Sequence, residues 1–326
     1  MVASRAGLPA GWVDPELATL TADRFFDSAW MYERKFDGER CLVYRNGAEV
    51  ALMTRNGQRV NSTYPELAAA LAAQQAADFV VDGEVVAFDG SVTSFSRLQQ
   101  RLGVRNPPEP LLRSVPVVYY LFDVLRADGR DVRGLPLRAR KQILRTLLSF
   151  SGPLRFTVHR SAGGQAYWDQ ACSRGWEGLV VKRADSLYRS GRSRDWLKFK
   201  CENSQEFVIG GFTDPRGSRA GFGALLIGYY DPDGRLAYAG KVGTGFDTET
   251  LRSLRDRLGA LEQDSTPFQQ GPPVRERGVH WVRPELVAQV GFSEWTDAGE
   301  LRHPRFQGLR DDKAAREVVR EVPSGS

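Results

Sequence analysis

Cysteine is scarce in this sequence: three residues, Cys41, Cys172 and Cys201, occur among 326. A scattered and odd-numbered set excludes a four-cysteine zinc module and is typical of a reducing compartment, so we interpret all three as packing residues. No stretch of about 18 consecutive apolar residues is present to span a bilayer, and residues 1–7 contain no signal-peptide core. These absences predict a soluble cytoplasmic protein with no membrane partner.

Glycine-rich phosphate loops are also absent. The sequence contains neither GxxxxGK followed by Ser or Thr nor GxGxxG, and it shows no internal repeats or low-complexity tracts. Any bound nucleotide must therefore be held by another arrangement. A cleft centred on a lysine is the candidate.

The composition permits two folded domains and a mildly basic surface. A chain of 326 residues spans two domains of the usual size, and 41% hydrophobic residues suffice for real cores. With 45 Lys and Arg against 40 Asp and Glu, the net charge of +5 permits a polyanionic partner without establishing one.

Positive charge is more concentrated in two parts of the sequence. In the first, arginines recur every four residues, so a helix there would present one basic face. The second, residues 182–202, contains seven cations and three acids, an excess of +4. The arginines of these rows are Arg97, Arg101 and Arg105, and Arg189, Arg192 and Arg194. A solvated surface explains such rows equally well, but next to a site that handles phosphates a phosphate backbone would be the better explanation.

Residues 32–40 hold the segment on which the chemistry is centred. Lys35 precedes an Asp-Gly pair and a second cation, Arg40. A lysine with its ordinary pKa of about 10.4 stays protonated at neutral pH, so cations or a metal must lower that pKa before it acts as a nucleophile. Arg40, Lys198 and Lys200 are candidates for that role, and the glycine lets something bulky approach the backbone. Taken alone, the segment is equally an Asp-Gly turn after a strand.

Two carboxylates occur where an apolar strand is expected. Glu84 falls within the apolar run 79–88, and Glu177 introduces the strand 178–182. A buried carboxylate costs several kcal/mol unless a cation, a metal or hydrogen-bond donors satisfy it. A metal site is therefore one explanation, and for Glu84 a surface-facing edge strand is the alternative.

Two lysines and one aromatic residue also stand out. Lys198 and Lys200 share one face of strand 196–200, where they repel each other unless an anion such as phosphate lies between them. An exposed edge strand is the alternative. Phe122 lies in the apolar strand 116–125, where an aromatic residue is usually part of the core.

The order of apolar and turn segments predicts an α+β fold in two domains. An irregular lead-in is expected over 12–30. The expected strands are 30–34, 40–45, a strand ending at 52–54, 79–88, 116–125, 178–182, 196–200, 206–212, 224–230, 236–242 and 286–295. The expected helices are 65–77, 135–150, 164–175 and 248–261. The pattern changes at 201–204, so we place the domains at 1–203 and 204–326, the second a small barrel of OB type.

The segment Lys35-Phe36-Asp37-Gly38-Glu39-Arg40 resembles the KxDGxR motif of the covalent nucleotidyltransferases, which comprise ATP-dependent DNA ligases, RNA ligases and mRNA-capping enzymes. Further segments are similar to the family's other motifs, in the family's order: 54–57, 82–84, 120–123, 177–182, 196–200 and 310–313. The set in particular resembles the ligase domain of bacterial non-homologous end-joining DNA ligases, here without attached polymerase or nuclease domains.

This resemblance implies a nucleotidyltransferase (adenylation) domain with antiparallel sheets and flanking helices, followed by an OB-fold β-barrel. It also implies that Lys35 takes AMP from ATP, that AMP passes to the 5′-phosphate at a nick, and that the 3′-hydroxyl closes the strand. The other implied site residues are Glu33 at the adenine amino group, Phe122 stacked on the adenine, Arg40 and Arg55 at sugar and phosphate, Lys198 and Lys200 at the α-phosphate, Glu84 and Glu177 at Mg²⁺ or Mn²⁺, Asp37 beside the nucleophile, and Arg310, Asp312 and Lys313 in the C-terminal motif.

Two alternatives remain open. RNA ligases and capping enzymes share the lysine chemistry, and a catalytically silent nucleic-acid clamp would keep the basic barrel without the nucleophile. The matches at 302–304, 310–313 and 205–245 favour a DNA end-joining ligase. We expect a monomer in the bacterial cytoplasm, associated with the nucleoid, that acts on nicked or broken double-stranded DNA beside end-binding and polymerase repair proteins.

Overall fold

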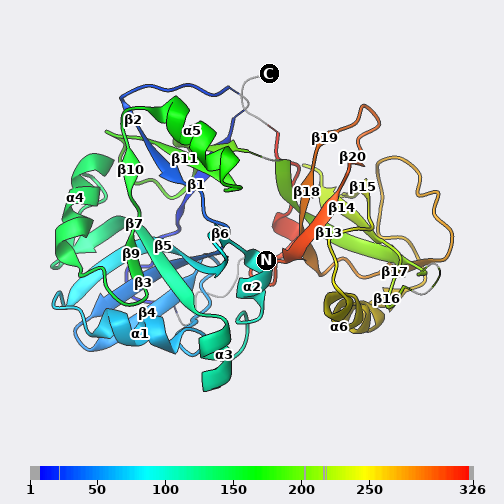
Figure 1. Ribbon diagram of the computed structural model, residues 1–326, viewed down its shortest axis with the longest axis horizontal. Helices are drawn as coiled ribbons and strands as arrows, with labels where there is room; N and C mark the ends of the chain where they lie inside the picture. The colour runs from blue at the N-terminus through cyan, green and yellow to red at the C-terminus, as the bar shows by residue number, and fades with distance from the viewer. Residues whose placement is uncertain (1–7, 22, 202, 216, 218, 323–326) are drawn as a thin grey trace. The chain divides into compact units, whose positions relative to one another are not determined.

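The computed structural model describes residues 8–322 except 22, 202, 216 and 218. The chain folds as two compact units, one running to Cys201 and the other from residue 202 to Val322 (Figure 1). The sequence places the boundary after residue 203, and the first strand of the second unit begins at Asn203. Residues 1–7, in which no signal peptide was found, and Glu202, counted in the charge window, lie outside the described residues.

The first unit contains a seven-stranded sheet, which includes the expected strands 40–45, 79–88, 116–125 and the one ending at 52–54. Its main path runs β4-β3-β5-β7-β8, with β6 added to β5 and β9 to β7. Every pairing is antiparallel except that of β7 with β9. The bounds are β3 Glu39–Asn46, β4 Glu49–Thr54, β5 Asp78–Asp89, β6 Val92–Thr93, β7 Val117–Ala127, β8 Arg130–Asp131 and β9 Leu154–Phe156.

A second sheet of the first unit carries the nucleophile segment. Its order is β1-β12-β11-β2-β10, with bounds β1 Glu16–Leu20, β2 Trp30–Arg34, β10 His159–Arg160, β11 Gly178–Arg183 and β12 Gly191–Lys200. The prediction of an irregular segment over 12–30 is wrong for residues 16–20, which pair in parallel with β12. The sequence did not predict this strand because Glu16 is a charged residue at a buried position. Its carboxylate accepts hydrogen bonds from the Arg189 N–H and the Ser193 hydroxyl, which are far away in the sequence.

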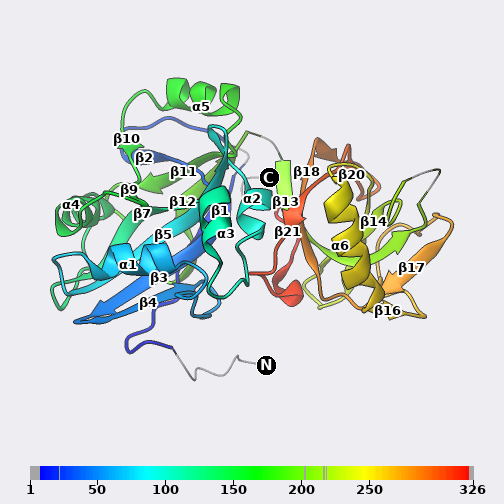
Figure 2. The same ribbon diagram turned by 60° about the horizontal axis from the view of Figure 1, so that its bottom comes forward.

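Helices pack against these sheets. The bounds are α1 Pro65–Ala72, α2 Phe95–Gln99, α3 Glu109–Ser114, α4 Leu137–Leu147 and α5 Gly164–Ser173. The helix expected over 65–77 ends at Ala72, and Gln74 beyond it accepts a hydrogen bond from the Ser149 N–H at 2.7 Å. Figure 2 shows α1 beside β3 and β4. No helix in the described part of the chain is long and apolar enough to cross a bilayer.

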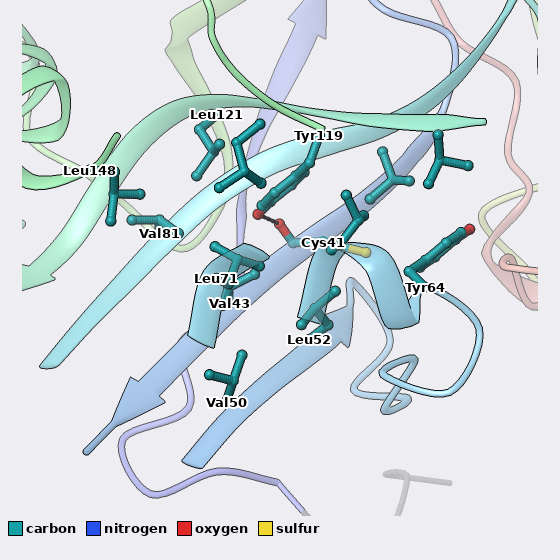
Figure 3. Packing of buried hydrophobic residues seen from close by; sticks show 14 of the residues in the cluster. Cys41, Val43, Val50, Leu52, Tyr64, Leu71, Val81, Tyr119, Leu121 and Leu148 are labelled. Carbon is teal, nitrogen blue, oxygen red and sulfur yellow. Dashed lines mark hydrogen bonds between the residues drawn. The ribbon is translucent and has the colours of Figure 1, made fainter. Parts of the chain in front are cut away.

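The core of the first unit lies between the seven-stranded sheet and helices α1 and α4. Figure 3 shows Val43 and Leu52 from the strands packed with Leu71 from α1. Each such aliphatic side chain stabilises the fold by about 1.5–3 kcal/mol on burial. Cys41 is buried in this core, as predicted for a packing residue, and its carbonyl accepts the Tyr119 hydroxyl at 2.7 Å.

The other two cysteines form a disulfide, so their prediction as separate packing residues is wrong. Cys172 lies in α5 and Cys201 directly follows β12, with their Cα atoms 5.3 Å apart. Their sequence separation of 29 residues gives no sign that a helix and a strand end meet in space. A disulfide that closes a loop of this size stabilises a fold by about 2–4 kcal/mol.

The second unit is a curled antiparallel sheet with one helix, which confirms the α+β class and the second barrel-like domain. Strand β13 is central because it pairs with β14, β17 and β18. The helix α6, Thr248–Gly259, is capped by Asp247 and buries its leucines in the core. The expected strand 286–295 divides into two, β18 and β19.

The strands of the second unit have the bounds β13 Asn203–Thr213, β14 Leu225–Tyr230, β15 Leu236–Val242, β16 Glu262–Gln263, β17 Val279–Val282, β18 Val287–Phe292, β19 Glu294–Trp295, β20 Leu301–Arg302 and β21 Arg305–Leu309.

Candidate active site

Lys35 and Glu177 form an ion pair at adjacent strand ends. Lys35 follows β2 and Glu177 precedes β11, and the Lys35 N–H donates to the Gly178 carbonyl at 2.9 Å. The Lys35 Nζ contacts Glu177 Oε1, and the two side chains are 17% and 18% exposed. The antiparallel pairing of β2 with β11 thus brings together two motifs that are far apart in the sequence.

The charge around Lys35 differs from the prediction. Burial lowers the pKa of Lys35, but Glu177, Asp37 and Glu84 raise it by more, so the net pKa lies above its ordinary value. The expectation that nearby cations lower this pKa is therefore wrong for this structure. Lys35 is held as an ammonium by carboxylates, and it must lose its proton before it can attack.

Gly38 is required for close packing of the protein against itself. A Cβ at this position would lie 2.2 Å from the Val85 carbonyl oxygen and 2.8 Å from Val86 Cγ1. A side chain would push the motif off strand β5, so the glycine holds the segment after Lys35 against the seven-stranded sheet. The sequence predicted a close approach at this glycine, and the partner in the structure is β5.

Arg40 is fixed by a buried carboxylate. Its Nε and Nη2 donate to the two oxygens of Asp82 at 2.5 and 2.6 Å, and the Tyr188 hydroxyl donates to the same carboxylate at 2.7 Å. The Arg40 guanidinium lies 4.4 Å from the centroid of the Phe122 ring. Bidentate pairing restricts the guanidinium to one orientation.

Glu33 is buried and bound by two lysines. Lys141 contacts its Oε1, and Lys182 lies 2.7 Å from its Oε2. Burial raises the pKa of Glu33, but these lysines outweigh it and hold that pKa below its usual range. Both carboxylate oxygens of Glu33 are therefore engaged within the protein.

Sequence reasoning did not single out Lys141 and Lys182, which pair with Glu33. Lys141 belongs to α4, and its Nζ also donates to the Thr157 carbonyl at 2.9 Å. The signal was present, because Lys141 falls on the same helical face as the buried Leu137 and Leu144. Lys182 was counted only as surface charge, yet it is 1% exposed.

Phe122 is enclosed by cations and by another aromatic ring. The Lys182 Nζ lies 4.1 Å from its ring centroid, and Trp196 packs edge-on at 5.9 Å. The Phe122 residue is only 7% exposed. A cation against a ring face makes a favourable electrostatic contact, so this ring has a fixed position.

Glu84, Lys198 and Lys200 lie on the surrounding strands, and Arg55 lies in the turn after β4. Glu84 in β5 is opposite Arg40 in β3, and Lys198 and Lys200 in β12 are opposite Val180 and Gly178 in β11. Both lysines therefore lie on the strand that pairs with β11, the strand directly after Glu177. The Arg55 N–H donates to the Arg40 carbonyl at 3.1 Å.

The residues of the C-terminal motif gather within the second unit. Arg310 makes a bidentate pair with Asp312 at 2.9 Å, and Lys313 contacts Glu206 at 3.1 Å. The segment 310–313 forms a turn, and a short 3₁₀ segment, Ala315–Glu317, follows it.

Two family descriptions match the chain. "ATP dependent DNA ligase domain" covers residues 16–200, and "ATP dependent DNA ligase C terminal region" covers residues 218–313. The chain belongs to the ATP-dependent DNA ligase family. The first match contains Lys35 and Glu177, and the second contains Arg310 and Lys313. The resemblance found from the motifs is therefore confirmed.

The relatives of this ligase include proteins of end joining. It is 41% identical over 320 residues to the multifunctional non-homologous end joining protein LigD of Pseudomonas aeruginosa, covering 96% of this chain and 37% of that protein. It is 41% identical over 302 residues to the multifunctional non-homologous end joining DNA repair protein LigD of Mycobacterium tuberculosis strain H37Rv, covering 90% and 38%. The ligase thus spans less than two fifths of the length of these relatives.

A solved structure supports the same assignment. The structure described as "mycobacterial DNA ligase D complexed with ATP and MES" is 36% identical to this ligase and superposes with a TM-score of 0.69. The match covers 95% of this chain and 98% of that one. Both units of the ligase therefore follow the fold of a related ligase.

The predicted basic rows differ in their exposure. Arg101 is fully buried, so its prediction as a DNA contact on an exposed helix face is wrong. The helix α2 ends at Gln99, and Arg101 instead pairs with Glu66 at 2.9 Å and donates to the carbonyls of Thr63 and Val115. The exposed members of the two rows are Arg105, Arg189, Arg192 and Arg194, with Arg97 half-buried.

Replacing Arg101 by Gln is expected to lower the free energy of unfolding by about 3 kcal/mol, because two carbonyls and Glu66 lose a buried charged donor. Denaturant unfolding measures this change. Arg105→Gln, at an exposed neighbour, is the matched control and should stay within about 0.5 kcal/mol of the parent. An Arg101→Gln protein of unchanged stability would contradict the structural role.

Proposed function

We propose that this ligase seals breaks in double-stranded DNA through a lysyl-AMP intermediate at Lys35 and serves non-homologous end joining. The observation that carries the proposal is the partly buried Lys35–Glu177 pair at the junction of β2 and β11. The LigD relatives support the biological context, and matches to DNA ligases favour this function over an RNA ligase or a capping enzyme.

The donor set around Lys35 fits a divalent cation. Glu177 Oε2 is buried and has no hydrogen-bond partner in the described structure, although Oε1 pairs with Lys35. Glu84 lies close enough to raise the pKa of Lys35. In the described chain no group of three or more His, Cys, Asp or Glu side chains is placed to hold a metal ion by itself, so ATP phosphates would complete the coordination. Glu84 and Glu177 would hold Mg²⁺ or Mn²⁺, which supplies positive charge opposite the phosphates when bound.

Three displacements at phosphorus follow from this arrangement. In the first, Glu177 releases the Lys35 ammonium, which passes a proton to water. The free amine bonds to the α-phosphorus of ATP as the bond from that phosphorus to pyrophosphate breaks, and the proton lost by the new phosphoramide nitrogen also goes to water. In the second, a 5′-phosphate at the break displaces Lys35 from AMP. In the third, the 3′-hydroxyl displaces AMP and the strand closes. The chain contributes positive charge and alignment, for which Lys198, Lys200 and Arg40 are proposed.

The remaining assignments rest on the same proposal. Phe122 and the backbone of Glu33 are assigned to the adenine, Arg55 to the sugar and phosphate, and Asp37 to the turn beside the nucleophile. We further propose that the ligase acts as a monomer in the bacterial cytoplasm at the nucleoid, with end-binding and polymerase repair proteins at the same break.

Intact mass spectrometry tests the proposed function. Incubation with ATP and Mg²⁺ should add one AMP to the protein, whereas GTP should add nothing. The labelled protein should then close nicked DNA. Absence of the adduct would favour the silent clamp, and an adduct formed only from GTP would favour a capping enzyme.

The exposed arginines at and before β12 are expected to contact the DNA backbone. Arg189, Arg192 and Arg194 are exposed, and Arg192 Nη1 donates to the Ala18 carbonyl at 2.8 Å. Changing all three to Gln should reduce the slope of log K against log salt by about 2–3 because three phosphate contacts are lost. Lysyl-AMP formation should stay near normal. An unchanged slope would mean that these arginines do not contact DNA and only form a solvated surface.

A further inference from the structure

Five residues that are dispersed in the sequence form a connected group in the first unit, here called the arginine–aromatic patch: Arg34, Arg160, Tyr167, Arg174 and Trp176. The Arg34 Cζ lies 4.4 Å from the Trp176 ring centroid, and the Arg174 Cζ lies 6.0 Å from it. The Arg160 Cζ lies 4.4 Å from the Tyr167 ring. Tyr167 and Trp176 meet edge-on at 5.7 Å, so the aromatic rings join the three arginines.

The fold, not the local sequence, assembles this patch. Arg34 ends β2, Arg160 ends β10, Tyr167 lies in α5, and Arg174 and Trp176 follow that helix before β11. Figures 1 and 2 both show β2, β10, β11 and α5 side by side. Arg160 and Arg174 are exposed, while Arg34 and Trp176 are half-buried.

The three guanidinium groups have no carboxylate partner in the described chain. Arg34 Nη2 donates to the Ser91 carbonyl at 3.3 Å and Arg160 Nη2 to the Gln170 amide oxygen at 3.4 Å, which are both neutral acceptors. Arg34 Nε is buried without an acceptor. Burial lowers the pKa of Arg34, and the neighbouring Arg174 lowers it further. By contrast, the fully buried Arg101 and Arg140 are both paired with carboxylates.

Nearby acids are engaged elsewhere and do not neutralise the patch. Glu177, next to Trp176, pairs with Lys35, and Glu33 pairs with two buried lysines. Three like charges held together by rings repel one another, and an anion relieves that repulsion. Arginine with aromatic neighbours is the combination that proteins use for phosphate backbones, because the planar guanidinium donates in a fork and stacks on rings.

We infer that the arginine–aromatic patch binds the phosphodiester backbone of the DNA that this ligase joins. The inference rests on the proposed function and adds a DNA contact that the basic rows of the sequence do not contain. Arg34 precedes Lys35 and Trp176 precedes Glu177, so a strand bound here lies against the segments that carry the reacting groups. The triphosphate of ATP is the other source of the same phosphate chemistry.

Changing both Arg160 and Arg174 to Gln tests the inference while leaving Arg34 beside the nucleophile intact. Binding to nicked DNA, measured across a series of salt concentrations, should lose about 1.8 from the slope of log K against log salt, and affinity near 0.1 M salt should fall on the order of 10- to 100-fold. The double Lys variant, Arg160→Lys with Arg174→Lys, keeps the charge and should keep most of the slope.

A matched control comes from the second unit. Arg235 and Arg283 are exposed but paired with Asp231 and Glu285, so changing both to Gln should leave the slope unchanged. An unchanged slope in the Arg160/Arg174 variant would overturn the inference, as would a raised KM for ATP with normal DNA binding, which would assign the patch to the nucleotide. DNA binding is measured without ATP, so failure of the parent to form lysyl-AMP would count against the proposed function alone.

Discussion

Lys35→Ala is expected to abolish the covalent AMP adduct. Lys35 is the amine at the junction of β2 and β11, and it is paired with the carboxylate proposed to bind the metal. Lys35→Arg should fail as well, because a guanidinium stays protonated at any pH at which the protein is folded and cannot form the phosphoramide. Intact mass after incubation with ATP and Mg²⁺ measures the adduct directly.

The Lys35 variants need a control for folding. Removing the ammonium leaves Glu177 without its ion pair, so the thermal midpoint of each variant should be compared with that of the parent. Lys241→Ala removes an exposed lysine of the second unit that pairs with Glu276, and it should be labelled normally. Adduct formation at the parental level in either Lys35 variant would end the proposal of a lysyl-AMP intermediate.

The combined change Arg310→Ala and Lys313→Ala is expected to slow lysyl-AMP formation strongly and the closure of a pre-adenylated nick only slightly. Both cations are about 15% exposed and converge on Glu206, with Asp312 fixing Arg310. We propose that the second unit brings them to the β- and γ-phosphates of ATP during charging. Pyrophosphate leaves only in that step, so cations that orient it add nothing to a step that expels AMP.

Two rates decide this prediction. One is the formation of lysyl-AMP from ATP, and the other is the closure of a nick that already carries AMP. Arg257→Ala is a matched control, because Arg257 makes an exposed pair with Asp311 in the same unit and should change neither rate. Equal losses in both rates for the double variant would mean that Arg310 and Lys313 only hold the second unit together.

Most strands were predictable because each one has an apolar pattern that local sequence records. The 79–88 run and the strand 178–182 correspond to β5 and β11. The prediction failed where a long-range partner decided the conformation. Residues 16–20 became a strand only by pairing with β12, and the helix that would have exposed Arg101 ended at Gln99. Such outcomes depend on contacts between distant segments, which the hydrophobic periodicity of the local sequence does not report.

The sequence by itself determined the family of this ligase, since the KxDGxR segment and the ordered motifs occur together in that family, and it predicts Lys35 as the nucleophile. It also determined the α+β composition through local apolar periodicity. Only the tertiary structure decided how the charges and the cysteines are paired: Lys35 with Glu177, Glu33 with Lys141 and Lys182, and Cys172 with Cys201. It also left Arg34, Arg160 and Arg174 without a carboxylate partner among the described residues. The physical reason is that motif and periodicity are properties of neighbouring residues, whereas burial and electrostatic pairing depend on which distant segments the sheets bring together.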